Sequence, residues 1–307
     1  MPVGQNLTID RIPWNFIHNT ELPCIKPWGY LTDMFTDKSD RFAITVEVVP
    51  PGGPQADPLL GTLQSLQGLP IDGFSVATNP VARPRMSAMA LCALLQRQTG
   101  RPAILHCTTR DHNRLSLQGL LWGALAMGIE TVLATTGDFV ALGDRATTSD
   151  VRDTDVFGLI EMARSSGLYT GVVLDPGPQS QGLEKPVRRL ERKIEAGAQF
   201  VVTQPFYDEA GLDELAAATR HIDIPIVLGI LPLRTPRHAE FLHQKVSGIN
   251  VPAGVRRRMT RAEDPVADGI ANAREVLALA RDRFAGACLM PPFDRFEMLT
   301  GILAHSS

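Results

Sequence analysis

A glutamate stands inside a short apolar run, where a carboxyl group is difficult to ionise. Glu47 lies between valines in the stretch Thr45–Pro51, which reads Thr-Val-Glu-Val-Val-Pro-Pro. Loss of water around such a carboxyl raises its pKa, and a carboxyl with a pKa near neutrality can donate a proton to a substrate. We therefore interpret Glu47 as a candidate general acid, with a structural carboxylate at a strand end as the alternative.

Further polar side chains lie in or directly after apolar runs of the same kind. His106 alone could be a ligand, an acid–base group or a hydrogen-bonded wall residue. Asp138 follows Gly137, whose small size lets the backbone approach a bound molecule closely. Gln204 offers a donor and an acceptor, which suits the edge of an amide-like heterocycle. Phe206 could stack on such a ring or close the mouth of a barrel.

The residue inventory argues against several reaction classes. Lys193 is the lysine nearest to the end of an apolar run, and it falls within a predicted helix, which disfavours Schiff-base chemistry. The sequence contains no Gly-x-Ser-x-Gly motif, and no Gly-x-Gly-x-x-Gly follows a predicted strand. The remaining carboxylates, histidine, amide and apolar walls could bind rings and move protons. A redox cofactor is the natural complement to such a pocket.

Eight apolar runs recur along the chain, with helical patterns between them. They are rich in Val, Ile, Thr and Leu, as parallel strands buried on both faces are. This alternation predicts a closed (β/α)8 barrel, the TIM barrel, which carries its chemistry at the carboxyl ends of the strands. The predicted strands are Phe42–Pro50, Gly73–Asn79, Ala103–Arg110, Thr131–Asp138, Leu168–Pro176, Gln199–Phe206, Pro225–Leu233 and Ala285–Phe293.

Helical spacing of apolar residues fills the intervals between these strands. Asp155 and Asp208 are placed to cap two of the helices. The segment Val246–Arg261 separates two helices after the seventh strand, where an added specificity element would sit, and long loops are expected over Phe139–Arg152 and Gly177–Glu184. The predicted helices are Asp57–Gln67, Arg85–Gln98, Leu115–Met127, Asp153–Ser166, Lys185–Ala196, Asp208–His221, Arg237–Lys245, Pro265–Ala285 and Arg295–Leu303.

Composition narrows the class of protein. The chain has 307 residues, a net charge of −3 and a pI near 6.2. This charge balance predicts no large basic surface of the kind that binds a nucleic-acid backbone. The run Arg256–Arg258 is interpreted as a solvated turn or helix end. No apolar run approaches the roughly 20 residues of a membrane span, and Met1–Arg11 lacks a signal-peptide pattern. The four cysteines form no Cys-x-x-Cys pair, and we predict a cytoplasmic protein whose Cys92, Cys107 and Cys288 are small buried side chains.

We divide the chain into an N-terminal extension, residues 1–40, and a barrel domain, residues 41–307. The extension carries Trp14, Phe16, Trp28 and Tyr30 among polar residues and prolines, without a clear period. It is interpreted as a segment packed over the outside of the barrel, or alternatively as a docking segment for a partner or a second subunit.

Several motifs, in this order and on these predicted strands, resemble the methylenetetrahydrofolate reductase family of flavin-dependent barrel enzymes, bacterial type. The resemblance covers roughly residues 42–304. The motifs are Val46-Glu47-Val48-Val49-Pro50-Pro51, His106-Cys107-Thr108, Thr136-Gly137-Asp138, Leu190-Glu191-Arg192-Lys193 with Glu195-Ala196-Gly197-Ala198, Thr203-Gln204-Pro205-Phe206, and Gly229-Ile230-Leu231-Pro232-Leu233.

The resemblance implies noncovalent FAD rather than FMN in the barrel mouth. NADH or NADPH would reduce the flavin, which would then reduce methylenetetrahydrofolate to the methyl form. Glu47 would be the acid that assists opening of the folate ring. Asp138 would lie near the flavin and the pterin, and Gln204 would bind the pterin edge. His106 and Thr78 would line the flavin site.

The same resemblance places Lys193 near the polar portion of the cofactor. Thr136 and Asp175 fall at flavin-contact positions but depart from the common pattern, because many members have arginine and tyrosine there. At Asp175 the departure predicts that one flavin contact is missing or replaced.

Two other functions are compatible with the sequence. Glu47, His106, Asp138 and Asp175 could converge on a divalent ion in a metal-dependent barrel lyase, although the absence of a His-x-His pair disfavours it and no metal site is predicted. Alternatively, the chain could be a non-catalytic subunit of a one-carbon-pathway complex that uses residues 1–40 for docking. A homo-oligomer is expected for this chain, with methylenetetrahydrofolate reduction as the leading function.

Overall fold

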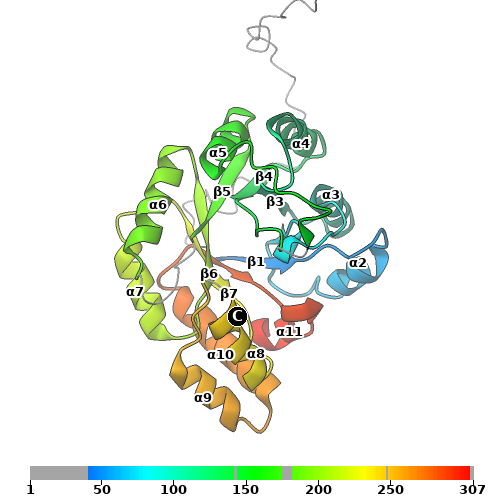
Figure 1. The fold of residues 1–307 in the computed structure, drawn as a ribbon. Helices are drawn as coiled ribbons and strands as arrows, with labels where there is room; N and C mark the ends of the chain where they lie inside the picture. The colour runs from blue at the N-terminus through cyan, green and yellow to red at the C-terminus, as the bar shows by residue number, and fades with distance from the viewer. Residues whose placement is uncertain (1–40, 142–143, 175–181, 247, 305–307) are drawn as a thin grey trace, which may run out of the picture.

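The predicted barrel is confirmed by a computed structural model, which describes residues 41–141, 144–174, 182–246 and 248–304. Eight parallel strands close in chain order, with β8 paired to β1. Helices surround the strands on the outside (Figure 1). Residues 1–40 lie outside the described residues, so the proposed extension stays a prediction.

The strands span fewer residues than the apolar runs that predict them, because most runs continue past the sheet into loops at the rim. They are β1 (Ala43–Val48), β2 (Gly73–Val76), β3 (Ala103–Thr108), β4 (Thr131–Thr135), β5 (Tyr169–Leu174), β6 (Phe200–Pro205), β7 (Ile226–Ile230) and β8 (Gly286–Leu289).

The helices follow the strands as expected. They are α2 (Asp57–Gln64), α3 (Ala88–Thr99), α4 (Arg114–Ala126), α5 (Val156–Ser165), α6 (Glu184–Glu195), α7 (Glu209–Thr219), α8 (Pro236–Lys245), α9 (Ala253–Arg261), α10 (Pro265–Ala280) and α11 (Met298–Leu303), with short 3-10 turns η2 (Pro80–Ala82) and η5 (Pro292–Asp294).

Local capping chemistry explains several helix starts. Asp155 accepts a hydrogen bond from the Gly158 amide, and Asp208 accepts one from the Gly211 amide, as their positions predict. The predicted start of α3 at Arg85 is wrong, because the Ser87 side chain caps the helix and it begins at Ala88.

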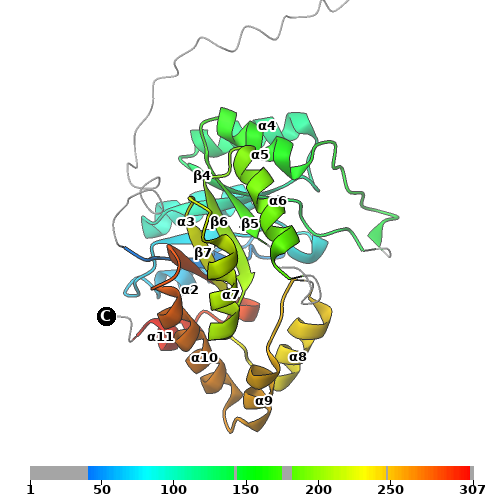
Figure 2. The same cartoon turned by 90° about the vertical axis from the view of Figure 1, so that its left-hand side faces the viewer.

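Helix α9 occupies part of the segment left open after the seventh strand, and it extends the molecule beyond α8 and α10 (Figure 2). The arginine run lies within this helix, with Arg258 in its last turn, so the turn interpretation is wrong and the helix-end interpretation is the closer one. Arg256 and Arg258 form ion pairs. Arg256 bonds Glu240 of α8 at 2.9 Å, and Arg258 bonds Glu275 of α10 at 2.8 Å. These pairs join α9 to its two neighbours.

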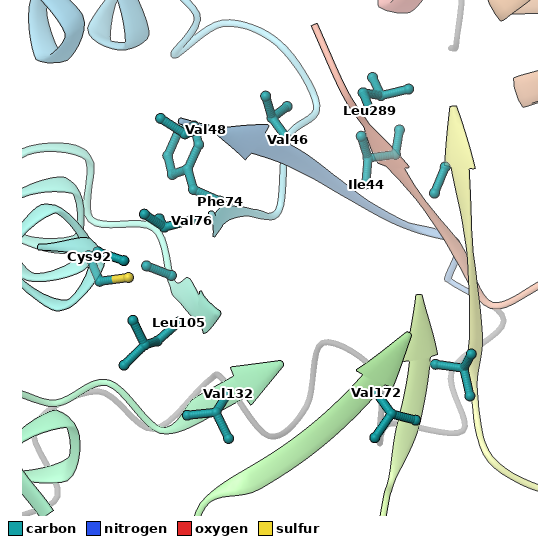
Figure 3. Close-up of a cluster of buried hydrophobic side chains, with 14 of the residues drawn as sticks. Ile44, Val46, Val48, Phe74, Val76, Cys92, Leu105, Val132, Val172 and Leu289 are labelled. Atoms are coloured by element: carbon teal, nitrogen blue, oxygen red, sulfur yellow. The ribbon is translucent and has the colours of Figure 1, made fainter. Parts of the chain in front are cut away.

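The strand side chains divide into an outer and an inner set, because successive residues of a strand point to opposite faces. The outer set packs against the helices and forms the main core. Figure 3 shows part of it, with Cys92 of α3 near Val76 and Leu105. Burial of Cys92, Cys107 and Cys288 is confirmed, and all three thiols are free.

The inner set fills the amino-terminal half of the barrel with side chains. Tyr169 and Phe200 stack there with ring centroids 5.2 Å apart. Gly171, the register partner of Phe200, must be a glycine, because a Cβ at this position would lie 2.2 Å from the Phe200 ring. Open space lies above this filled half, towards the carboxyl ends of the strands.

Among the residues described, no helix combines the length and the apolar character needed to cross a bilayer.

Candidate active site

A cavity of about 900 Å³ opens at the carboxyl ends of the strands, where the fold predicts the site. Its volume lies in the range of small-molecule and cofactor pockets, about 300–1,000 Å³. Seven sequence-predicted site residues line it together: Glu47, Thr78, His106, Thr136, Asp138, Lys193 and Gln204. Residues from opposite sides of the barrel therefore share one chamber.

Glu47 is an inward-facing residue of β1, two positions after buried Thr45, and its register partner on β2 is Ser75. The alternation that sends Val46 and Val48 to the outer core sends Glu47 into the cavity. Burial raises the pKa of Glu47 from 4.5 to about 7. A substantial share of the carboxyl is consequently protonated at neutral pH, as the sequence predicts for a general acid.

His106 of β3 is held as a neutral ring. Its Nε2 lies 2.7 Å from the Ser75 hydroxyl, and burial lowers its pKa to about 4. The Thr78 hydroxyl donates to the backbone carbonyl of His106, so this predicted residue supports the same strand. Burial also raises the pKa of the Cys288 thiol to about 12, which keeps it neutral. The His106 and Ser75 side chains of the chamber are thus polar and uncharged.

Gln204 lies in β6, two positions after Val202 of the inner set, so strand alternation turns its side chain inward. The pairing of β6 with β7 shifts between Val202 and Pro205, and the Thr203 hydroxyl accepts a 2.9 Å hydrogen bond from the Gly229 amide. A β-bulge of this kind re-aims the side chains that follow it. The Gln204 amide faces the same cavity as Glu47 of β1.

Asp138 lies in the turn that follows β4, at the rim of the cavity. Its carboxylate accepts a 2.6 Å hydrogen bond from the Val81 amide of the turn after β2. Gly137 adopts a φ of +71°, and a Cβ there would lie 3.1 Å from Thr108 and 3.2 Å from Arg110. Glycine is therefore required to bring Asp138 and Thr136 to the rim.

Helix α6 contributes a cationic wall. Lys193 is 9% exposed, and its ammonium donates a 2.7 Å hydrogen bond to the Val173 carbonyl. Lys185 and Arg189 lie eight and four residues earlier and also line the cavity, since residues four apart share one helix face. This wall could hold an anionic group.

Two predicted residues do not join this arrangement. Phe206 does not appear among the cavity-lining side chains; it packs against the outer core, and its ring lies close to Gly211 at the start of α7. The bulge in β6 breaks the strand alternation just before it. Asp175 falls outside the described residues, so its predicted flavin contact stays untested.

Sequence reasoning missed an apolar side of the chamber. Leu242 of α8, with Val246 and Ile249 after it, lines the cavity together with Leu231. The only signal was the extra segment after the seventh strand, which placed a specificity element in this region without identifying its residues. The chamber therefore combines one cationic wall with one apolar wall.

The metal-dependent alternative finds no support in the described part of the chain. Three or more His, Cys, Asp or Glu side chains do not gather there in a group that could hold a metal ion.

Stability should depend on pH through Glu47 and His106 in opposite directions. Between pH 4.5 and 7 the folded chain keeps a proton on Glu47 that the unfolded chain releases, so this contribution is lost as pH rises through 7. His106 affects the unfolding free energy between pH 6.5 and 4, where the unfolded chain binds a proton that the folded chain does not. Its contribution to stability is therefore lost as pH falls through this range. The two slopes largely cancel between pH 4.5 and 6.5.

Replacing Glu47 with Gln removes one of these slopes. Relative to wild type, the variant should gain stability between pH 5 and pH 8, by at most about 3 kcal/mol because one pKa unit corresponds to about 1.36 kcal/mol. Urea unfolding at both pH values measures this gain. A difference in unfolding free energy that is independent of pH would contradict the raised pKa.

The fold and the site define a class: a (β/α)8-barrel protein with a large chamber that carries a carboxyl group of raised pKa, a neutral imidazole and an amide. The sequence profile of the family described as methylenetetrahydrofolate reductase matches residues 33–282. The chain belongs to the methylenetetrahydrofolate reductase family. The match begins inside the proposed extension, at residue 33.

Relatives that carry the same family name are similar to this chain at modest sequence identity. A probable methylenetetrahydrofolate reductase (NADPH) from Caenorhabditis elegans is 28% identical over 151 residues, which cover 48% of this chain and 23% of that protein. A 5,10-methylenetetrahydrofolate reductase from Pectobacterium carotovorum is 24% identical over 207 residues, covering 66% and 68% of the two chains. The matched stretch is thus less than a quarter of the C. elegans protein.

Solved structures support the fold. An uncharacterized protein from Clostridium thermocellum, described as binding two copies of 5-methyl-5,6,7,8-tetrahydrofolic acid, superposes with a TM-score of 0.62 at 17% identity, covering 86% of this chain and 93% of that one. An oxaloacetate acetylhydrolase superposes with a TM-score of 0.52 at 12% identity, covering 86% and 79%. Both likenesses concern the barrel alone.

Proposed function

We propose that this protein reduces 5,10-methylenetetrahydrofolate to 5-methyltetrahydrofolate through a bound flavin, with NADH or NADPH as electron donor. The observation that carries the proposal is that Glu47 and Gln204 face one chamber, where burial holds the pKa of Glu47 near 7. Membership of the family and the folate ligand of the C. thermocellum protein support the same substrate.

The chamber fits a flavin dinucleotide. Its volume is about 900 Å³, and the wall formed by Lys185, Arg189 and Lys193 suits the two phosphates of FAD better than the single phosphate of FMN. When bound, the flavin supplies hydride transfer, which none of the side chains can perform. His106, Thr78, Thr136 and Asp138 line the same chamber and would surround the ring system.

The residues of this chain would bind and protonate the folate. Gln204 would pair its amide donor and acceptor with the pterin edge, and Asp138 would hold the pterin from the rim. The Glu47 carboxyl would donate its proton to the bridging nitrogen that leaves as the folate ring opens. The apolar wall of Leu242, Val246 and Ile249 would cover the less polar part of the ligand and exclude water.

Absorption spectroscopy with stopped-flow mixing tests the proposal. Purified protein, alone or after addition of FAD, should show a flavin spectrum that NADH or NADPH bleaches and methylenetetrahydrofolate restores. Lys193→Met should weaken FAD binding at least tenfold, because it removes a buried cation, whereas Arg188→Gln on the exposed face of α6 should leave it unchanged. Failure to bind FAD or FMN would contradict the proposal.

The oligomer and the partner are part of the same proposal. Helix α4 exposes 77% of Leu115 and 50% of Trp122, and apolar surface of this kind supports a homo-oligomer. Residues 1–40 could instead dock a partner subunit; light scattering of the full chain and of a chain lacking residues 1–40 separates these roles. Free buried Cys92, Cys107 and Cys288 support a reducing, cytoplasmic setting.

A further inference from the structure

Two arginines outside the cavity bind the rim turn that carries Asp138. Arg152 donates from Nη1 to the Thr136 carbonyl and from Nη2 to the Gly137 carbonyl, each at 3.1 Å. Arg110 donates from Nη1 to the Asp138 carbonyl at 3.2 Å. Three successive carbonyls of one turn are therefore bound by two guanidinium groups, neither of which lines the cavity.

The Arg110 side chain is fixed by burial and by its pairing with Asp111. Its side chain is 2% exposed and forms a paired contact with Asp111, at 2.5 Å from Nε and 2.8 Å from Nη2. Asp111 also accepts hydrogen bonds from Asn79 and Thr108, both at 3.2 Å. Such a fork fixes the direction of the third nitrogen, Nη1, towards the turn.

Arg152 is placed by the backbone rather than by burial. Its amide donates to the Thr109 carbonyl at 3.1 Å, and its guanidinium lies 4.3 Å above the Phe139 ring. Its φ of +45° is uncommon for a residue with a side chain, and such conformations persist where the surrounding contacts require them. The hydrogen bonds between Arg152 and the turn 136–138 therefore stabilise the conformation of both segments.

The Asp138 side chain extends this network to a second strained turn. Its carboxylate accepts the amide of Val81, and Asn79, Val81 and Ala82 all have positive φ between +43° and +54°. Asn79 is tied in turn to Asp111. The rim segments after β2 and β4 are consequently coupled through the Asp138 carboxylate and through Arg110.

We propose that Arg152 and Arg110 are positioning residues that fix the Asp138 carboxylate at the rim of the chamber. Both act through the turn 136–138 and touch no substrate. Loss of the Arg152 fork frees two carbonyls and lets the turn move, so the Asp138 carboxylate leaves the Val81 amide. Its kinetic consequence rests on the proposed function, whereas the structural consequence does not.

The test uses the full chain and variants of Arg152, because replacement of the buried Arg110 could prevent folding. Arg152→Gln should speed hydrogen exchange of the Val81 amide about tenfold, as should Asp138→Asn, since each removes the support of one hydrogen bond to a charged group. In the Asp138→Asn background, Arg152→Gln should add nothing. Arg152→Lys, which keeps the charge but lacks the two-pronged guanidinium group, should fall between wild type and Arg152→Gln.

Arg188→Gln is the matched control, because this exposed arginine pairs with Glu184 on α6, away from the turn, and it should leave Val81 exchange unchanged. In folate reduction, Arg152→Gln should lower kcat/KM about tenfold, again with no further loss when Asp138 is already Asn. Unchanged Val81 exchange in Arg152→Gln, or additive effects of the two changes, would overturn the proposal. Absent folate reduction with coupled exchange effects would overturn only the proposed function.

Discussion

Glu47→Gln is expected to abolish folate reduction and to leave reduction of the flavin by NADH or NADPH nearly intact. Gln has the same shape but cannot donate a proton, and general acid catalysis contributes about 10²–10⁴-fold. The flavin half-reaction needs no proton from this side chain. Rapid mixing measures each half-reaction separately, and steady-state turnover should fall with the folate step alone.

Glu130→Gln provides the matched control for this experiment. Glu130 lies just before β4, at the opposite end of the barrel, and burial raises its pKa as well. Both half-reactions should proceed normally in this variant. A parallel loss of both half-reactions in Glu47→Gln would mean that Glu47 holds the structure and is not the acid.

Gly229→Ala is expected to destabilise the fold and to displace Gln204 at the same time. A Cβ at this position would lie 2.4 Å from the Thr203 carbonyl oxygen and 3.0 Å from the Gln204 carbonyl carbon. These are backbone atoms of the β6 bulge, which cannot move aside as a flexible side chain can. The expected loss is about 3 kcal/mol of unfolding free energy, as for severe overpacking of a core.

Activity should fall further than stability alone explains. A displacement of about 1 Å in a binding group can reduce the rate about 100-fold, and Gln204 lies within the irregular stretch of β6. Urea unfolding and kcat/KM, measured below the unfolding transition, separate the two effects. Gly61→Ala in α2 is the control: nothing lies within 4 Å of its Cβ position, so it should stabilise by up to about 1 kcal/mol. An active, stable Gly229→Ala protein would refute the role of the bulge.

The architecture could be predicted because its signals are local. Valine-rich strands with helical patterns between them, and acids such as Asp155 and Asp208 before helices, follow from periodicity and capping, which act over a few residues. Glu47 was recognisable for the same reason, because an isolated carboxyl inside an apolar run is conspicuous. The start of α3 could not be predicted in this way, since Ser87 and Arg85 are both plausible helix starts.

The candidate site was predicted only where a strand end exposes a residue by its position. Gln204 and Asp138 met this condition, but Phe206 did not reach the cavity, because a bulge in β6 precedes it and nothing in the sequence marks that bulge. The pairing of His106 with Ser75 depends on the register of β2 and β3, which joins residues 31 positions apart.

The chain by itself determined a barrel of eight strands, their order, and the side chains at their carboxyl ends, because strand alternation and helix periodicity are written in neighbouring residues. Only the tertiary structure decided which of these side chains share a chamber and how burial moves the pKa values of Glu47 and His106 in opposite directions. It also brought Arg110 and Arg152 into hydrogen bonds with the turn 136–138, which is distant from both in the sequence. Those properties depend on strand register and on desolvation, which arise only when distant segments close around one space.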